Sequence, residues 1–330
     1  MPDRGGFFKE MLREVLNARA SLNAALESLN DPEPDPWRPE PPRAAGPATA
    51  LVDEARLVEL ARTAGLEHRV DDVRRTARAG VRLTPAAVPG QSRLGGTPLV
   101  PAGFEWPTWY GRELAFVAQI DLAEVAAAGV AGTLPREGLL LVFAELAATI
   151  SGLAPEHAGS SRAVFVPPGV ELVHDARSPQ LREVAVEPTR ELQLPSAWSY
   201  LAEPLALEPD EADAWDELRA LLAQEQGVEL EDAGGGPIAL HRLLGYQDEN
   251  GREVELDCQL ASSGIDAADV MRYYELRDEH EAGARRWRLL LQVTADETIR
   301  LGEGGERLFV CIRDDDLRAG RFDEVWALLR

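Results

Sequence analysis

Six residues have side chains suited to holding a small ligand, and several of them recur at matching places in two stretches of the chain. They are Arg93, Trp106, Gln119, Arg242, Tyr246 and Gln292. Two guanidinium groups can clamp a carboxylate or a phosphate through paired hydrogen bonds. If the fold brings Arg93 and Arg242 together, we expect an anion-binding pocket lined by all six residues. The alternative is that each arginine pairs with an acidic neighbour.

Gln119 is a polar residue in the predicted strand 113–120, where the other residues from 114 to 120 are apolar. A buried glutamine needs hydrogen-bond partners. It therefore either ties down a loop or faces a ligand, and the structural tie is the favoured interpretation.

The chain carries no local motif for catalysis or cofactor binding. A P-loop is excluded because the only lysine, Lys9, lies far from any glycine-rich turn. The patterns G-x-G-x-x-G, G-x-S-x-G and H-E-x-x-H are missing, and the five histidines are scattered. The acidic run at 313–317 lacks the central glycine of a calcium loop and predicts a turn or a helix cap. We expect no cofactor, no metal and no catalytic residue, with a triad built from distant residues left open.

The two cysteines, Cys258 and Cys311, are too few for a disulfide framework or a zinc site. Both have apolar neighbours and are predicted to be buried free thiols on strands.

The charge of the chain restricts its partners. Its formal net charge is −23, from 57 acidic and 34 basic residues. Nucleic acids and anionic membranes would be repelled, whereas a basic protein would be attracted. No run reaches the roughly 18–20 apolar residues of a membrane helix, and charges interrupt the N-terminal segment, so no signal peptide is predicted. We expect a soluble, cytoplasmic protein.

The densest acidic segment spans residues 203–232, with eleven acidic residues and one basic residue. This composition predicts either a solvated helix face or a docking surface for a basic partner. The candidate contact residues are Asp210, Glu211, Asp213, Asp216 and Glu217.

Composition divides the chain into four regions. Residues 1–30 predict an amphipathic helix, which must fold back, pair with another copy or meet a partner, because a single apolar stripe cannot bury itself. Residues 31–50 form a proline-rich linker. Residues 51–80 predict a helical lead-in broken near Gly65, and residues 81–330 an α+β domain.

Short apolar runs predict strands at 113–120, 138–146, 162–168, 287–293 and 307–313. Their nearly continuous apolar content indicates strands covered on both faces.

Helical periodicity predicts helices at 121–128, 208–227, 266–283 and 321–330. The pair Asn250-Gly251 predicts a tight hairpin.

The β-rich part repeats itself weakly, in halves of about 81–200 and 236–330. Each half has an Arg-Leu-x-Gly segment, an apolar strand with one glutamine, and a strand led by glycine. The matched pairs are Arg93 with Arg242, Gln119 with Gln292, and Gly138 with Gly305. The repeat predicts an internal duplication about a pseudo-twofold axis, with a pocket between the halves.

A longer pattern of separated motifs resembles the YwqG-like family, a bacterial domain of unknown function. The first half carries it in Ser92, Leu94, Gly95, Gly96, Pro98, Trp106, Pro107, Gln119, Ile120, Asp121, Leu134, Pro135, Gly138 and Phe143. The second half carries it in 241–246, 258–260, 287–293 and the closing acidic and aromatic motif. The chain departs from the pattern at Gln247-Asp248-Glu249.

The resemblance covers about residues 81–330 and implies an internally duplicated α+β fold with mostly antiparallel sheets flanked by helices. It implies no established activity, cofactor or catalytic residue. Some relatives occur beside secreted-toxin loci, which makes an immunity-type role a hypothesis.

Three functional hypotheses follow. The first is a non-enzymatic module that binds a basic protein. The second is a small-molecule binder or enzyme with its pocket between the halves. The third is a scaffold that self-associates through its N-terminal helix. We favour the first, because the acidic charge supports it and no catalytic signature opposes it.

Overall fold

The computed structural model describes residues 52–130, 134–147, 149–175, 177, 179–228, 240–247, 252–296, 299–301 and 306–330. The chain divides into two compact units, Met1–Pro47 and Ala48–Arg330, and the described residues belong to the second. The expected N-terminal helix and proline-rich linker lie outside the described residues, as do Asn250-Gly251 and Gly305. No described helix is long and apolar enough to cross a membrane.

A ten-stranded sheet forms the centre of the fold, and all of its neighbouring strands pair antiparallel. Its strands, in sheet order, are β14 (Val325–Leu329), β13 (Arg307–Arg313), β12 (Trp287–Thr294), β11 (His241–Leu244), β1 (Arg78–Pro85), β10 (Val184–Gln193), β2 (Arg93–Leu94), β6 (Ala115–Asp121), β7 (Leu139–Ala144) and β8 (Ser161–Val166).

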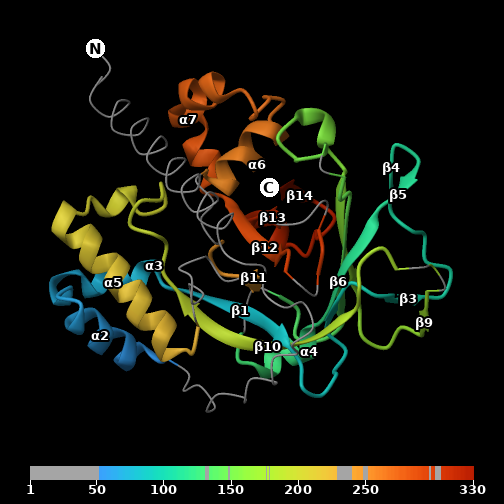
Figure 1. Cartoon of the computed structure of the whole chain (residues 1–330), viewed down its shortest axis with the longest axis horizontal. Coiled ribbons are helices and arrows are strands. Elements are labelled where there is room, and N and C mark those ends of the chain that lie inside the picture. The colour runs from blue at the N-terminus through green and yellow to red at the C-terminus, as the bar shows by residue number, and fades with distance from the viewer. Residues whose placement is uncertain are drawn as a thin grey trace, which may run out of the picture. The chain divides into compact units, whose positions relative to one another are not determined.

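The strand order is symmetric about its two central strands. One group of four consecutive strands, β2-β6-β7-β8, and a second group, β11-β12-β13-β14, flank the central pair β1 and β10. The sheet is strongly curved (Figure 1), and its two edge strands, β8 and β14, contact each other. All ten strands contribute to a single hydrophobic cluster. The fold is therefore α+β with a mostly antiparallel sheet, as the sequence predicted.

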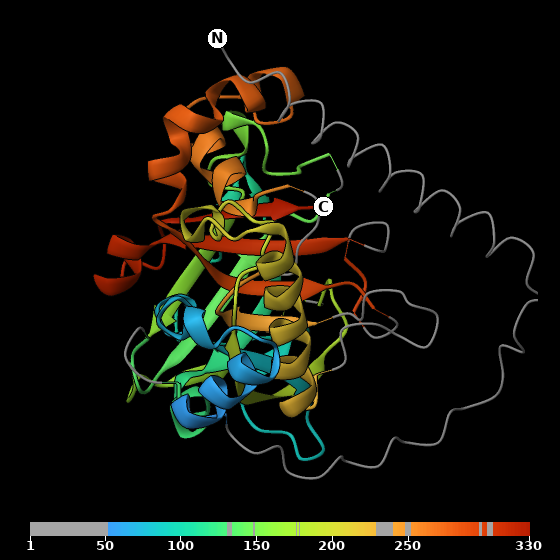
Figure 2. The ribbon, with the colours of Figure 1, turned by 90° about the vertical axis from the view of Figure 1, so that its left-hand side faces the viewer.

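Two groups of helices cover this sheet. The first packs around the buried Trp215 and consists of α2 (Glu54–Thr63), η1 (Glu67–Arg69), α3 (Val70–Thr76) and α5 (Pro209–Glu225). The second consists of α6 (Val254–Ser262) and α7 (Val270–Ala284). Figure 2 shows α5 running along the face that α2 and α3 also cover, with α7 at the far end.

Shorter elements complete the fold. They are the short sheets β3 (Leu99–Pro101) with β9 (Leu172–His174) and β4 (Thr108–Trp109) with β5 (Arg112–Glu113), the helices α4 (Leu122–Ala127) and α8 (Asp314–Arg318), and the turns η2 (Pro155–His157) and η3 (Glu203–Leu205).

The five strands predicted from apolar runs are all present, within a few residues of their expected ends. Helices α4, α5 and α7 also form where the periodicity placed them. The acidic run at 313–317 forms the first turn of the short helix α8, whose N-cap, Arg313, makes no side-chain capping hydrogen bond.

Two sequence predictions are wrong. The segment 321–330 does not close the chain as a helix, because Val325–Leu329 form the buried strand β14 against β13. A five-residue apolar run fits either element, and pairing with β13 decides between them. Cys258 lies on helix α6 rather than on a strand, although it is buried and free, as Cys311 is.

The helical lead-in ends four residues before its expected limit at residue 80. Helix α3 stops at Thr76, and β1 begins at Arg78. This strand occupies the middle of the sheet between β10 and β11, so pairing on both edges overrides local propensity.

Candidate functional site

The arginine and glutamine of each half occupy equivalent positions in the sheet. Arg93 on β2 lies directly opposite Gln119 on β6, and Arg242 on β11 lies directly opposite Gln292 on β12. Each glutamine follows a β-bulge by two residues, at Val117 in β6 and at Leu290 in β12. The same pair beside the same irregularity supports the duplication more strongly than the sequence echo does.

Both glutamines fasten the segment that leads into the neighbouring arginine strand. Gln119 Nε2 donates to the carbonyl of Gln91 at 2.8 Å, and Gln292 Nε2 donates to the carbonyl of Leu240 at 3.1 Å. Each acceptor lies two residues before the arginine of its half. Gln119 Oε1 also accepts from the Leu99 amide at 2.8 Å. Gln119 thus ties two loop segments to the sheet.

The two arginines do not meet, because β10 and β1 lie between their strands. Arg93 faces Glu183, with Nη1 and Oε2 3.6 Å apart. Arg242 Nε donates to Glu191 Oε1 at 2.8 Å, and both of these side chains are buried, with 7% and 3% exposed. Each arginine therefore has an acidic neighbour, and no anion clamp forms between the halves.

Two of the six ligand candidates share a cavity. Arg242 and Tyr246 line a hollow of about 80 Å³ beneath α5, together with Glu191, Gln193 and Arg219. Trp106 lines a separate hollow of about 40 Å³. Arg93, Gln119 and Gln292 line neither of these two cavities.

Tyr246 is held at the cavity wall by both ends. Its hydroxyl donates to the carbonyl of Thr76 at 2.7 Å, and its amide donates to Gln193 Oε1 at 2.6 Å. The guanidinium of Arg78 lies 4.3 Å from the ring centroid. Burial raises the pKa of Tyr246, so the phenol stays neutral.

A buried carboxyl adjoins this wall from α6. Glu255 is buried, and its Oε2 accepts from Gln247 Nε2 at 2.9 Å. Desolvation raises the pKa of Glu255. The hydroxyl of the buried Tyr200 has no hydrogen-bond partner among the described residues, and desolvation raises its pKa as well. Nothing in the sequence pattern had singled out these groups.

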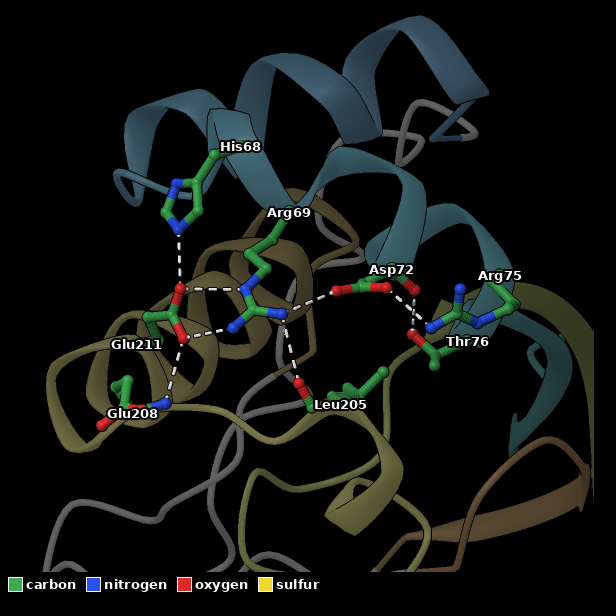
Figure 3. Close-up of polar contacts among 8 residues, drawn as sticks. All are labelled: His68, Arg69, Asp72, Arg75, Thr76, Leu205, Glu208 and Glu211. Atoms are coloured by element: carbon green, nitrogen blue, oxygen red, sulfur yellow. Dashed lines mark hydrogen bonds and ion pairs between the residues drawn. The ribbon is translucent and has the colours of Figure 1, made fainter.

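The acidic helix α5 is fixed to η1 by a network of ion pairs, shown in Figure 3. Glu211 accepts from Arg69 through both carboxylate oxygens, at 2.9 Å and 2.5 Å, and from His68 Nε2 at 2.7 Å. It also accepts from the Glu208 amide at 3.0 Å, which closes a capping box at the start of the helix. These hydrogen bonds hold the pKa of Glu211 well below its usual range.

The same arginine links further elements. Arg69 Nη1 reaches Asp72 and the carbonyl of Leu205, each at 3.1 Å. At the other end of α5, Arg56 of α2 pairs with Glu225 at 2.9 Å. The sequence predicted this helix at 208–227, but it predicted neither the capping box of Glu208 and Glu211 nor Arg69 as the partner of Glu211.

The five acidic candidates on α5 therefore divide into two groups. Glu211 and Asp216 are partly buried and engaged within the protein, Asp216 with Arg219 at 3.0 Å. Asp210, Asp213 and Glu217 are exposed, and no described residue forms an ion pair with them. Their spacing of three and four residues places them along one outer stripe of the helix. We call these three residues the α5 acidic stripe.

Among the described residues, no group of three or more histidine, cysteine or acidic side chains is arranged to hold a metal ion. Cys258 and Cys311 lie in one apolar cluster between α6 and β13.

Comparison with known proteins adds one match. The family model described as a domain of unknown function (DUF1963) matches residues 92–330. No curated protein matches the chain.

Proposed function

The match makes the chain a member of the DUF1963 family of domains of unknown function, and we propose that this member is a non-enzymatic module that binds a basic protein through helix α5. Neutralising a basic toxin, as an immunity protein does, would be one form of this function. The observation that carries the proposal is the α5 acidic stripe, which is exposed and has no ion-pair partner among the described residues.

The anchoring of α5 supports a binding role for the stripe. Trp215 is fully buried, and its Nε1 donates to the carbonyl of Pro195 at 2.9 Å. With the Glu211 and Glu225 ion pairs, this bond leaves α5 little freedom to move. A rigid, charged surface loses less conformational entropy on binding than a mobile one.

The net charge of −23 acts in the same direction. Complementary charge raises the rate at which a basic partner is captured, and this attraction weakens as salt is added.

A small-molecule binder is the second candidate, supported by the cavity beside Arg242 and Tyr246. Its volume of about 80 Å³ falls well below the roughly 300–1,000 Å³ of ordinary ligand pockets. The cavity therefore supports this function less well than the stripe supports protein binding.

The test compares two variants of equal charge. In the first, Asp210→Asn, Asp213→Asn and Glu217→Gln neutralise the stripe. In the matched control, three exposed acidic residues of α7 are neutralised, Glu275→Gln, Asp278→Asn and Glu279→Gln. Each variant and the unchanged protein capture partners from native lysate at low and at high salt, followed by mass spectrometry.

We expect one dominant basic protein with the unchanged chain and with the α7 control at low salt, and its loss at high salt. The stripe variant should capture at least tenfold less of it. Equal capture by both variants, or no basic partner at either salt, would refute the assignment to α5.

A further inference from the structure

The tip of the β4–β5 hairpin exposes an aromatic ring on an unfavourable backbone. Thr108 pairs with Glu113 and Trp109 with Arg112, which leaves Tyr110 and Gly111 as a two-residue turn. Both turn residues have positive φ, 48° and 77°. Such turns favour Asn-Gly or Gly-Gly, because a residue with a Cβ is strained there.

The Tyr110 ring makes few contacts within the protein that could offset this backbone strain. Tyr110 is 79% exposed. The Tyr110 ring contacts the ring of Trp109, and the two ring centroids are 4.7 Å apart. A residue kept in a strained conformation without burial points to a role outside the folding of its own chain.

The base of the hairpin is rigid. The indole of Trp109 donates to the carbonyl of Ala158, and the indole of Trp106 donates to the carbonyl of Leu114, each at 2.9 Å. Tyr110 thus lies at the tip of a fixed hairpin, and Figure 1 shows this β4–β5 hairpin at the periphery of the fold, on the side away from α5. Tyrosine on a rigid support contributes contact area at low entropic cost.

The neighbouring rings indicate which chemistry suits the tyrosine. Arg177 lies 4.4 Å from the ring centroid of Trp106, and Arg112 lies 5.7 Å from that of Trp109. No arginine of the described residues lies over Tyr110. The hairpin region therefore stacks guanidinium groups on its aromatic rings and leaves the outermost ring available.

From this placement we propose that Tyr110 is a recognition residue whose ring stacks on an arginine side chain of a basic partner protein. The exposed ring, the strained turn, the rigid base and the negative charge of the chain all fit this ligand. The inference rests on the proposed function only in that both assign a basic partner. The hairpin and α5 are separate contact surfaces.

The test uses the full chain, an oligoarginine peptide and an oligolysine peptide of the same length, with affinities measured by calorimetry at low salt. Tyr110→Asn removes the ring and suits the turn, whereas Tyr110→Phe keeps the ring. We expect Tyr110→Asn to weaken oligoarginine binding by about threefold and oligolysine binding by less. Tyr110→Phe should bind both peptides as the unchanged protein does.

Thermal unfolding separates recognition from a structural role. Since asparagine tolerates positive φ, Tyr110→Asn should raise the melting temperature by about 2 °C. A lower melting temperature, or unchanged oligoarginine affinity, would overturn the proposal. Neutralising the α5 acidic stripe should weaken the binding of both peptides by the same factor. The stripe variant could capture as much basic partner from lysate as the α7 control does, while Tyr110→Asn selectively loses affinity for oligoarginine. That pair of results would refute the α5 function and leave the Tyr110 proposal standing.

Discussion

The two halves of the sheet have equivalent arginine and glutamine positions but differ in how deeply their ion pairs are buried. In the first half, Arg93 faces Glu183, whose side chain is 51% exposed. In the second half, Arg242 forms an ion pair with Glu191 of the central strand β10, and both side chains are buried. Solvent screens the first pair and not the second. We therefore expect stability to depend little on Arg93 and strongly on Arg242.

The turn that follows each arginine differs as well. Gly95 and Gly96 have φ of 62° and 73°, and the equivalent residues Leu244 and Gly245 have φ of 61° and 77°. The backbone geometry is thus shared while the side chain is not. The framework constrains conformation, and the packing around it decides which residues are tolerated.

Removing the arginines should give the largest contrast between the halves. Arg242→Gln leaves the Glu191 carboxylate buried and unpaired, and we expect it to lower the free energy of unfolding by about 3–5 kcal/mol. Arg93→Gln should cost less than about 1 kcal/mol. Urea denaturation of both variants measures the difference, and equal losses would contradict the distinction between the two pairs.

Gly95→Ala should be the next largest effect. A Cβ at this position would lie under 3.0 Å from the carbonyl oxygen of Arg182, a backbone atom that cannot move aside. We expect a loss of about 3 kcal/mol. Gly103→Ala is the matched control, since its φ is 78° and no atom lies within 4 Å of a Cβ there. The control should lose only the conformational term of about 1 kcal/mol.

Both glutamines should contribute to stability. Gln119→Leu removes the donor to the Gln91 carbonyl and the acceptor of the Leu99 amide, at an expected cost of about 1–3 kcal/mol. Gln292→Leu removes one of two donors to the Leu240 carbonyl, which keeps the Thr294 hydroxyl at 2.9 Å, so its expected cost is about 1 kcal/mol. Chemical denaturation of the two variants tests the equivalence of the framework. Costs that differ by more than about 2 kcal/mol would show that only one glutamine acts as a tie.

Replacing the buried Glu255 should have the smallest effect on stability. Because Glu255 is ionisable, this effect should depend on pH. Its pKa is raised in the folded protein, so the folded state binds more protons than the unfolded state above about pH 4.3. Stability from this group is therefore full below that pH and is lost as pH rises through the folded pKa. Glu255→Gln should be more stable than the unchanged protein at pH 7 and equal to it at pH 3.5. Denaturation at both pH values tests this, and a variant that is less stable at pH 7 would contradict it.

The sequence predicted what depends on local pattern. The apolar runs located β6, β7, β8, β12 and β13, and the repeated Arg-Leu-x-Gly segment predicted a duplication that the strand order supports. The expectation that Gln119 ties a loop also agrees with its two hydrogen bonds.

What the sequence could not predict depends on contacts between distant residues. Strand β10 contains Pro188 and mixed polar residues, and it is a strand because β1 and β2 pair with its two edges. The partners Glu191 for Arg242 and Arg69 for Glu211 are 51 and 142 residues away in the chain. No spacing rule connects residues at such separations, so the division of the acidic candidates into engaged and outward residues required the structure.

Carboxyl footprinting tests the central claim, that the α5 acidic stripe contacts a basic partner, most directly. A carbodiimide and an amine label exposed carboxylates of the free protein and of its complex with the captured partner, and mass spectrometry locates the label. We predict that Asp210, Asp213 and Glu217 lose labelling in the complex, while the α7 control residues keep theirs. Unchanged labelling of the stripe, or equal protection on α7, would contradict the claim.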